Sequence, residues 1–130
     1  MFTGKPLPPL RPLPDAVLDA GWAAGFVHIA RQSALGFGSD RRIAVAARPA
    51  VEIRKDGARV VVLPCTSQDS SMKPDFRELT GLVEWKRPTA RRTFACARYE
   101  VVPAEALLEK IGALGHPARI QLLDWLKGRY

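Results

Sequence analysis

Short apolar runs, separated by turn-forming residues, predict a mainly antiparallel β-protein that ends in helices. We expect strands over 25–31, 43–54, 59–65, 81–86 and 93–102, helices over about 15–22, 103–113 and 117–128, and loops over 31–42 and 66–80. Several short strands followed by terminal helices indicate a small, strongly bent antiparallel sheet or barrel. The proline-rich residues 1–14 predict an extended arm, which leaves 15–130 as a single domain.

The strongest local signal is the dipeptide Asp56-Gly57, which lies between two apolar runs. This dipeptide favours a tight hairpin turn, because glycine tolerates positive φ. If these two residues form the turn, four apolar side chains lie on one face, with Val51 opposite Val62 and Ile53 opposite Val60. The pattern therefore predicts a β-hairpin with one apolar face.

The same register has a consequence at the open end of the hairpin. Pro49 then lies opposite Pro64, and neither proline can donate a ladder hydrogen bond, so regular pairing is expected to fail there. Arg48 emerges from one strand, and Thr66 and Ser67 emerge from the other. Because a guanidinium offers a planar fork of donors to phosphate oxygens, this end of the hairpin is a candidate phosphate site.

Composition and charge narrow the class of protein. The chain has 130 residues, 47% of them hydrophobic, and a formal net charge of +7 at pH 7. Such a length fits one domain, and such a charge favours polyanions such as RNA, DNA, an acidic protein or an anionic surface. No apolar run reaches the roughly 18 residues of a membrane span, and prolines interrupt the segment where a secretory signal would be apolar. We expect a cytoplasmic protein without a membrane partner.

The cysteines and histidines are too few for a metal centre. Cys65 and Cys96 fall in apolar, strand-like segments, and only His28 and His116 could add ligands. Buried free thiols are the expected state of the two cysteines, and a disulfide between neighbouring strands is the alternative in an oxidising compartment. We therefore expect no metal and no other cofactor.

The hairpin resembles a motif of the MazF/PemK family of toxin endoribonucleases. That family carries Arg-Pro before an apolar strand, then a turn and a second strand that ends in threonine. Here the matching segments are Arg48-Pro49-Ala50-Val51 and Val61-Val62-Leu63-Pro64-Cys65-Thr66-Ser67. The resemblance implies an α+β, mainly β fold: a small SH3-like antiparallel barrel of the CcdB/PemK type with C-terminal helices. It also implies a homodimeric type II toxin that cleaves single-stranded mRNA without metal and binds an acidic antitoxin.

The resemblance assigns roles to a few residues. Arg48 is implied as the stabiliser of phosphate charge and Thr66 as the group that orients the phosphate, with Ser67 as a supporting donor. The general base is not evident, because the place where some family members carry an acidic residue reads Ala95-Cys96-Ala97. His28 and Glu100 are the candidates for that role, since each can accept a proton.

A second basic segment suggests RNA contacts. Cations and aromatic residues crowd a predicted turn, and two arginines lie in the loop between the first two strands; together the candidates are Arg41, Arg42, Trp85, Lys86, Arg87, Arg91 and Arg92. Lysine and arginine bind phosphates, and an aromatic ring can stack on an unpaired base. The other interpretation is that the aromatic side chains face the core and the turn is simply solvated.

Two alternatives to a ribonuclease stay open. The missing carboxylate favours a catalytically silent RNA- or protein-binding barrel of the same fold. A CcdB-like toxin directed at gyrase is the other, because such relatives recognise their target through C-terminal residues and this chain ends in the aromatic-bearing segment 125–130.

Overall fold

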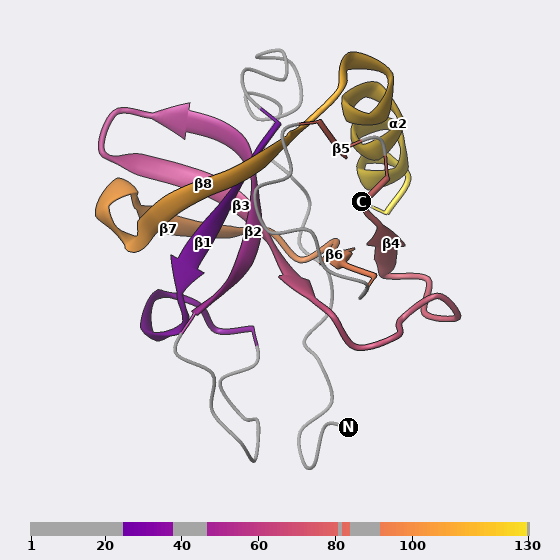
Figure 1. The fold of residues 1–130 in the computed structure, drawn as a ribbon, viewed down its shortest axis with the longest axis horizontal. Coiled ribbons are helices and arrows are strands. Elements are labelled where there is room, and N and C mark those ends of the chain that lie inside the picture. The colour runs from indigo at the N-terminus through magenta and orange to yellow at the C-terminus, as the bar shows by residue number, and fades with distance from the viewer. Residues whose placement is uncertain (1–24, 38–46, 81, 84–91, 130) are drawn as a thin grey trace.

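The fold is a bent antiparallel sheet, which is followed along the chain by a C-terminal α-helix (Figure 1). The computed structural model describes residues 25–37, 47–80, 82–83 and 92–129. Within these ranges the strands are β1 (Phe26–Arg31), β2 (Ala47–Asp56), β3 (Arg59–Thr66), β4 (Phe76–Glu78), β5 (Leu82–Val83), β6 (Phe94–Cys96), β7 (Glu100–Pro103) and β8 (Leu107–Leu114). The helices are η1 (Gln32–Ala34), η2 (Ala104–Ala106) and α2 (His116–Lys127). This content confirms the expected α+β, mainly β class.

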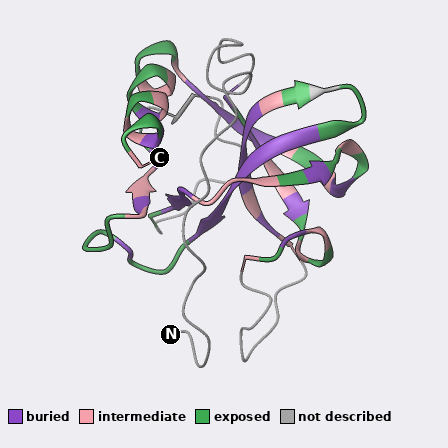
Figure 2. Cartoon of the chain, turned by 180° about the vertical axis from the view of Figure 1, so that it is seen from behind, coloured by how far each residue is buried: buried purple, intermediate pink, exposed green. Residues whose placement is uncertain are grey.

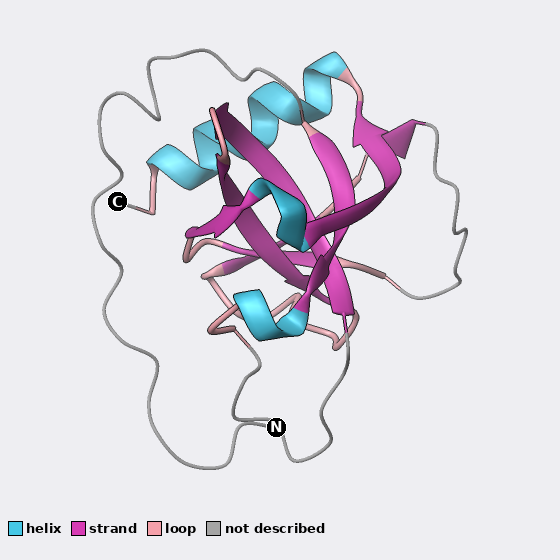
Figure 3. Ribbon diagram, turned by 90° about the vertical axis from the view of Figure 1, so that its left-hand side faces the viewer, coloured by secondary structure: helices cyan, strands magenta, loops and turns pink. Residues whose placement is uncertain are grey.

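The sheet is barrel-like but does not close. Its order is β4-β6-β3-β2-β1-β8-β5, and β7 also pairs with β3. One edge of strand β3 pairs with β2. Along its other edge, residues 59–62 pair with β7 and residues 65–66 pair with β6. A long strand that changes partners in this way bends the sheet, and α2 lies along one side of it (Figure 3).

Both faces of the central strands are buried (Figure 2). Neighbouring residues of a strand point to opposite faces, so Leu63 belongs to a core cluster with Leu122 and Leu126 of α2, whereas Val62 belongs to a second cluster beneath η2. A third, smaller cluster contains Phe76, Phe94 and Cys96, with the ring of Phe37 packed against it. The continuous apolar run of β3 reflects this burial on two sides.

The predicted register of the hairpin is wrong. Asp56 pairs with Arg59, so the turn residues are Gly57 and Ala58, and Gly57 has a φ of 61°. A register shift between Glu52 and Arg54 then leaves Ile53 as a bulge. Consequently Val51 lies opposite Leu63 rather than Val62. The four apolar residues therefore do not share one face, because Val51 and Ile53 join the first core cluster while Val60 and Val62 join the second.

The helix predicted over 103–113 is also wrong, because residues 107–114 form β8. Strand β8 pairs with β1 on one side and with β5 on the other. These pairings satisfy backbone N–H and C=O groups of β1 and β5, which would lose these partners if residues 107–114 were helical. The strand predicted over 93–102 is divided into β6 and β7. The helix predicted over 117–128 is confirmed as α2, with Pro117 in its first turn.

The remaining expectations fall partly beyond the described ranges. Strand β2 covers residues 47–54 of the strand predicted over 43–54, and β5 covers Leu82–Val83 of the strand predicted over 81–86. Residues 43–46, 81 and 84–86 lie outside the described ranges. The arm predicted over 1–14 and the helix predicted over 15–22 lie outside the described residues.

In the described part of the chain, no helix combines the length and the apolar character needed to span a membrane.

Candidate functional site

The two prolines of the central hairpin mark the place where β2 and β3 separate. Their ladder ends at the pair formed by Ala50 and Pro64. Beyond that pair, β2 stays bonded to β1 through Arg48, whereas β3 passes to β6 and pairs with it through Thr66. The loss of β2–β3 pairing at the prolines is thus confirmed, although both prolines lie within strands.

This separation leaves Arg48 and Thr66 on the same face of the sheet. Ala50 opposes Pro64, opposed residues of an antiparallel ladder share a face, and so do alternate residues along each strand. In addition, Nη1 of Arg48 donates a hydrogen bond of 3.1 Å to the carbonyl oxygen of Cys65, the residue before Thr66. The guanidinium of Arg48 therefore lies against the backbone that carries Thr66.

The guanidinium of Arg48 is held from several directions. Its Nε donates to Oε1 of Gln32 at 2.6 Å, and its Cζ lies 4.8 Å from the centroid of the Phe37 ring. The residue is only 4% exposed. Because a buried charge is stable only when polar or π groups replace water, these contacts explain how Arg48 can be buried. They also fix the plane of its donors.

The turn that carries Phe37 is itself anchored at both sides. Nε2 of Gln32, in η1, donates to the carbonyl oxygens of Phe37 (2.6 Å) and Leu35 (3.4 Å). The carboxylate of Glu100, on β7, accepts from the backbone N–H of Gly36 (2.7 Å) and of Phe37 (2.9 Å). Glu100, a candidate general base, thus uses both oxygens to bind a neighbouring turn.

The hydroxyl groups at the end of β3 differ in burial. Thr66 is 7% exposed, and its Oγ1 accepts a 3.1 Å hydrogen bond from the backbone N–H of Gln68. Accepting this bond does not use the hydroxyl hydrogen, so Thr66 can still donate to a phosphate oxygen. Ser67 is exposed and follows directly in the chain.

The other candidate base, His28, contacts a buried carboxylate. Its Nε2 lies 3.5 Å from Oε2 of Glu52. Burial lowers the pKa of His28 below its ordinary value of 6.5; Glu52 opposes this effect, whereas the charges of Lys110 and Lys55 reinforce it. Burial therefore favours the neutral form of the imidazole. His28 pairs with Ala50 across the β1–β2 ladder, further along it than Arg48.

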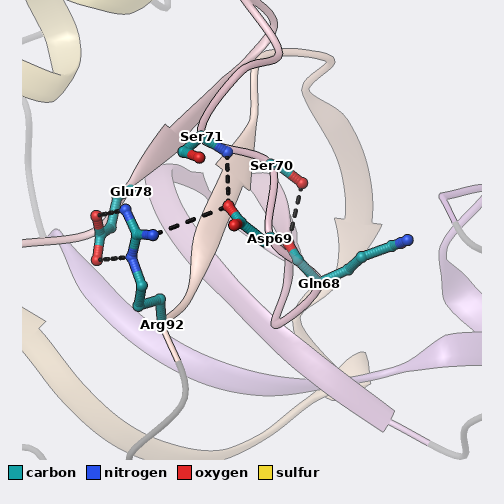
Figure 4. A network of polar contacts seen from close by, with 6 residues as sticks. All are labelled: Gln68, Asp69, Ser70, Ser71, Glu78 and Arg92. Atoms are coloured by element: carbon teal, nitrogen blue, oxygen red, sulfur yellow. Dashed lines mark hydrogen bonds and ion pairs between the residues drawn. The ribbon is translucent and has the colours of Figure 1, made fainter.

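Most of the candidate RNA-binding residues lie outside the described ranges, namely Arg41, Arg42, Trp85, Lys86, Arg87 and Arg91. Arg92 is described, and it belongs to a polar network on the surface (Figure 4). Its Nε and Nη2 donate to the two oxygens of Glu78 at 2.9 and 2.7 Å, and its Nη1 lies 3.9 Å from Oδ1 of Asp69. The hydrogen bond from Arg92 lowers the pKa of Glu78. The two carboxylates therefore offset part of the positive charge that Arg92 could present to RNA.

Both cysteines are buried free thiols, as expected. Burial raises the pKa of Cys65 well above its ordinary value and raises that of Cys96 to about 11, so neither forms a thiolate at neutral pH. Within the described ranges, no group of three or more His, Cys, Asp or Glu side chains could hold a metal ion.

No sequence pattern points to Gln32 or Phe37 as site residues, although both contact Arg48. They lie just after β1, in a stretch without periodicity, and a glutamine has no local signal for a role in holding a cation. Their importance follows only from the pairing of β1 with β2, which brings the end of β1 beside the start of β2.

Comparisons with known proteins bear on the fold. No protein-family model matches the sequence, and no curated protein sequence matches it significantly. Solved structures do match. The Mycobacterium tuberculosis toxin MazF-mt6 has a TM-score of 0.56 and 16% identity, over 80% of this chain and 94% of that one. An endoribonuclease in complex with its cognate antitoxin, from a mycobacterial species, has a TM-score of 0.54 and 15% identity, over 84% and 93%. An Mtb toxin has a TM-score of 0.50 and 19% identity, over 68% and 98%. The chain has the MazF-like fold.

Proposed function

We propose that this chain with a MazF-like fold is the toxin of a type II toxin–antitoxin system, an endoribonuclease that cleaves single-stranded mRNA without a metal ion. The observation that carries the proposal is the placement of Arg48 and Thr66 on one face, where β2 and β3 separate. The structural similarity to MazF-mt6 and to an endoribonuclease bound to its antitoxin supports it. We infer that the protein acts in the cytoplasm and that residues 15–130 form its functional domain, with 1–14 as an arm.

The proposed reaction is an internal transfer at one phosphate of the RNA. The 2′-oxygen attacks the adjacent phosphorus and loses its proton, the bond to the 5′-oxygen breaks, and that oxygen takes up a proton. The products are a cyclic phosphate and a 5′-hydroxyl. Negative charge builds on the non-bridging oxygens, where the fixed guanidinium of Arg48 would stabilise it. The hydroxyl of Thr66 would donate to the same phosphate, with Ser67 in support.

The candidate bases are both engaged elsewhere. His28 contacts Glu52, and Glu100 binds the turn at Gly36. The proposed chemistry therefore depends more on charge stabilisation by Arg48 than on a strong general base, and a slow reaction is expected.

The partners follow from charge and from the fold. A net charge of +7 suits both RNA and an acidic antitoxin. We infer that Arg41, Arg42, Trp85, Lys86, Arg87, Arg91 and Arg92 contribute RNA contacts, and that the active protein is a homodimer. The strand-separation site would then be the place where RNA and an antitoxin segment compete.

A direct test uses the purified protein and a long single-stranded RNA in EDTA. We expect defined fragments that end in a cyclic phosphate. Arg48→Ala should abolish cleavage, Thr66→Ala should reduce it strongly, and Thr66→Ser should keep part of it because the hydroxyl remains. Arg59→Ala and Thr80→Ala, which alter exposed residues, are the matched controls. Intact RNA with the wild-type protein, under conditions where it binds the RNA, would reject the enzyme.

One observation favours the second candidate, a silent binding module: Arg48 is 4% exposed and already donates to two protein oxygens. RNA binding without cleavage would support that candidate. The gyrase-directed alternative gains no support from the C-terminal segment, because Trp125 packs against the core and Arg129 bonds to Asp75.

A further inference from the structure

We propose that Glu100 and Gln32 are positioning residues for Arg48, acting through the turn formed by Leu35, Gly36 and Phe37. The predictions about RNA cleavage rates rest on the proposed function. The predictions about the orientation of the Arg48 guanidinium rest on geometry alone. Neither residue touches the reacting phosphate in this scheme.

A continuous chain of contacts links Glu100 to the guanidinium. The carboxylate of Glu100 accepts the N–H groups of Gly36 and Phe37. The carbonyl oxygen of Phe37 accepts from Nε2 of Gln32, and Oε1 of the same glutamine accepts from Nε of Arg48. The ring of Phe37 lies over the same guanidinium, so the turn contacts Arg48 a second time.

The anchor of this chain is part of the same framework as Thr66. Glu100 opposes Val62 on β3, and Thr66 ends that strand. The turn is therefore fixed to β3 through Glu100, while Arg48 reaches it from β2 through Gln32. A hydrogen bond to an ionised carboxylate is stronger than one between neutral groups, and here two successive amides each donate such a bond to the carboxylate of Glu100. The turn thus orients the guanidinium of Arg48 relative to the strand that carries Thr66.

Orientation matters here because the charge of arginine is permanent. Its guanidinium stays protonated at any useful pH, so the protein can tune only where its donors point. An error of about 1 Å in the position of a group can lower a rate by about a hundredfold. Loss of Glu100 would leave two backbone N–H groups without their acceptor and release the turn, and with it the side chains of Gln32 and Phe37.

The kinetic test compares Glu100→Ala, Glu100→Asp and Gln32→Leu with the control Glu105→Ala, an exposed carboxylate in η2. We expect Glu100→Ala and Gln32→Leu to lower kcat about ten- to a hundredfold with little change in KM, because RNA binding does not depend on the plane of one guanidinium. Glu100→Asp, which keeps the carboxylate, should recover part of the rate. In an Arg48→Lys background, which lacks the Nε donor, the effect of Glu100→Ala should shrink to about twofold or less.

A second measurement does not depend on activity. In the wild-type protein, the ¹⁵N signal of the Arg48 Nε–H should be sharp and protected from exchange. Glu100→Ala should shift and broaden it, and should speed hydrogen exchange at the amides of Gly36 and Phe37. Glu105→Ala should leave all three signals unchanged.

The outcomes separate this inference from the ribonuclease proposal. If the wild-type protein cuts no RNA, the ribonuclease proposal fails, while the Arg48 signal still decides whether Glu100 positions the guanidinium. If Glu100→Ala cleaves RNA at the wild-type rate with an unchanged Arg48 signal, the positioning role is overturned. Faster cleavage by Glu100→Ala would overturn it as well, since the turn would then block Arg48 instead of orienting it.

Discussion

Replacing Arg48 with methionine tests whether this residue stabilises the fold as well as the proposed reaction. Methionine occupies similar apolar space but cannot donate a hydrogen bond. The variant loses the bonds to Gln32 and to the Cys65 carbonyl, each worth about 1.5–3 kcal/mol for a charged donor, and the contact with the Phe37 ring, worth about 1–2 kcal/mol when desolvated. It also relieves the cost of burying a charge, which is several kcal/mol. We expect a net loss of about 1–4 kcal/mol in the free energy of unfolding.

The assay is urea unfolding, followed by circular dichroism at pH 7, for the wild type, Arg48→Met, Arg48→Lys and the exposed control Arg59→Met. The control should change the stability by about 0.5 kcal/mol or less. Cleavage is then measured without urea, where each variant is folded, and Arg48→Met should lose about a hundred- to a thousandfold in kcat.

Two results would refute the reasoning separately. If Arg48→Met unfolds at the wild-type urea concentration, the contacts of the guanidinium do no more than offset the cost of burying its charge, and the expected net stabilisation is refuted. If it cleaves RNA at the wild-type rate, Arg48 does not stabilise phosphate charge. Activity lost with stability retained would mean that the net contribution of Arg48 is to the reaction and not to the stability of the fold.

Three further predictions concern other parts of the chain. Burial lowers the pKa of His28, so the unfolded chain takes up a proton there more readily than the folded chain, and stability should fall as pH drops below about 6.5. Thermal melts of His28→Gln should lack this part of the pH dependence. A pH profile of His28→Gln that matches the wild type would contradict the burial of His28 beside Glu52. Gly57→Ala should lower stability by about 1 kcal/mol in urea melts, because the φ of 61° is costly for alanine; a variant as stable as the wild type would mean that the turn rearranges. Glu78→Gln should strengthen RNA binding and steepen its salt dependence, because Arg92 gives up a charged partner; equal affinity in a binding titration would exclude Arg92 from the RNA surface.

The sequence carried enough information for the central hairpin and for α2, but not for the second half of the sheet. Asp56-Gly57 and Pro117 act locally, so their effects could be read from a few residues. Residues 107–114 have no such signal: the spacing of Leu107, Leu108 and Ile111 fits a helix, and only the pairing with β1 and β5 makes the segment a strand. Likewise, the role of Gln32 depends on a contact across strands that no local pattern encodes.

The predicted end of the β2–β3 ladder lies close to the observed one despite the error in register, and the reason is physical. At the turn the true pairing is two residues away from the predicted one, since Lys55 opposes Val60 instead of Ala58. The bulge at Ile53 then takes up one residue, so at the prolines the error is a single residue. What brings Arg48 to the end of β3 is the end of the β2–β3 ladder, and each strand carries a proline at that end, which has no N–H to donate across it. A prediction that depends on where pairing stops is therefore less sensitive to register than one that depends on which side chains face each other. For this reason the predicted apolar face is wrong, whereas the predicted loss of β2–β3 pairing at the prolines is confirmed.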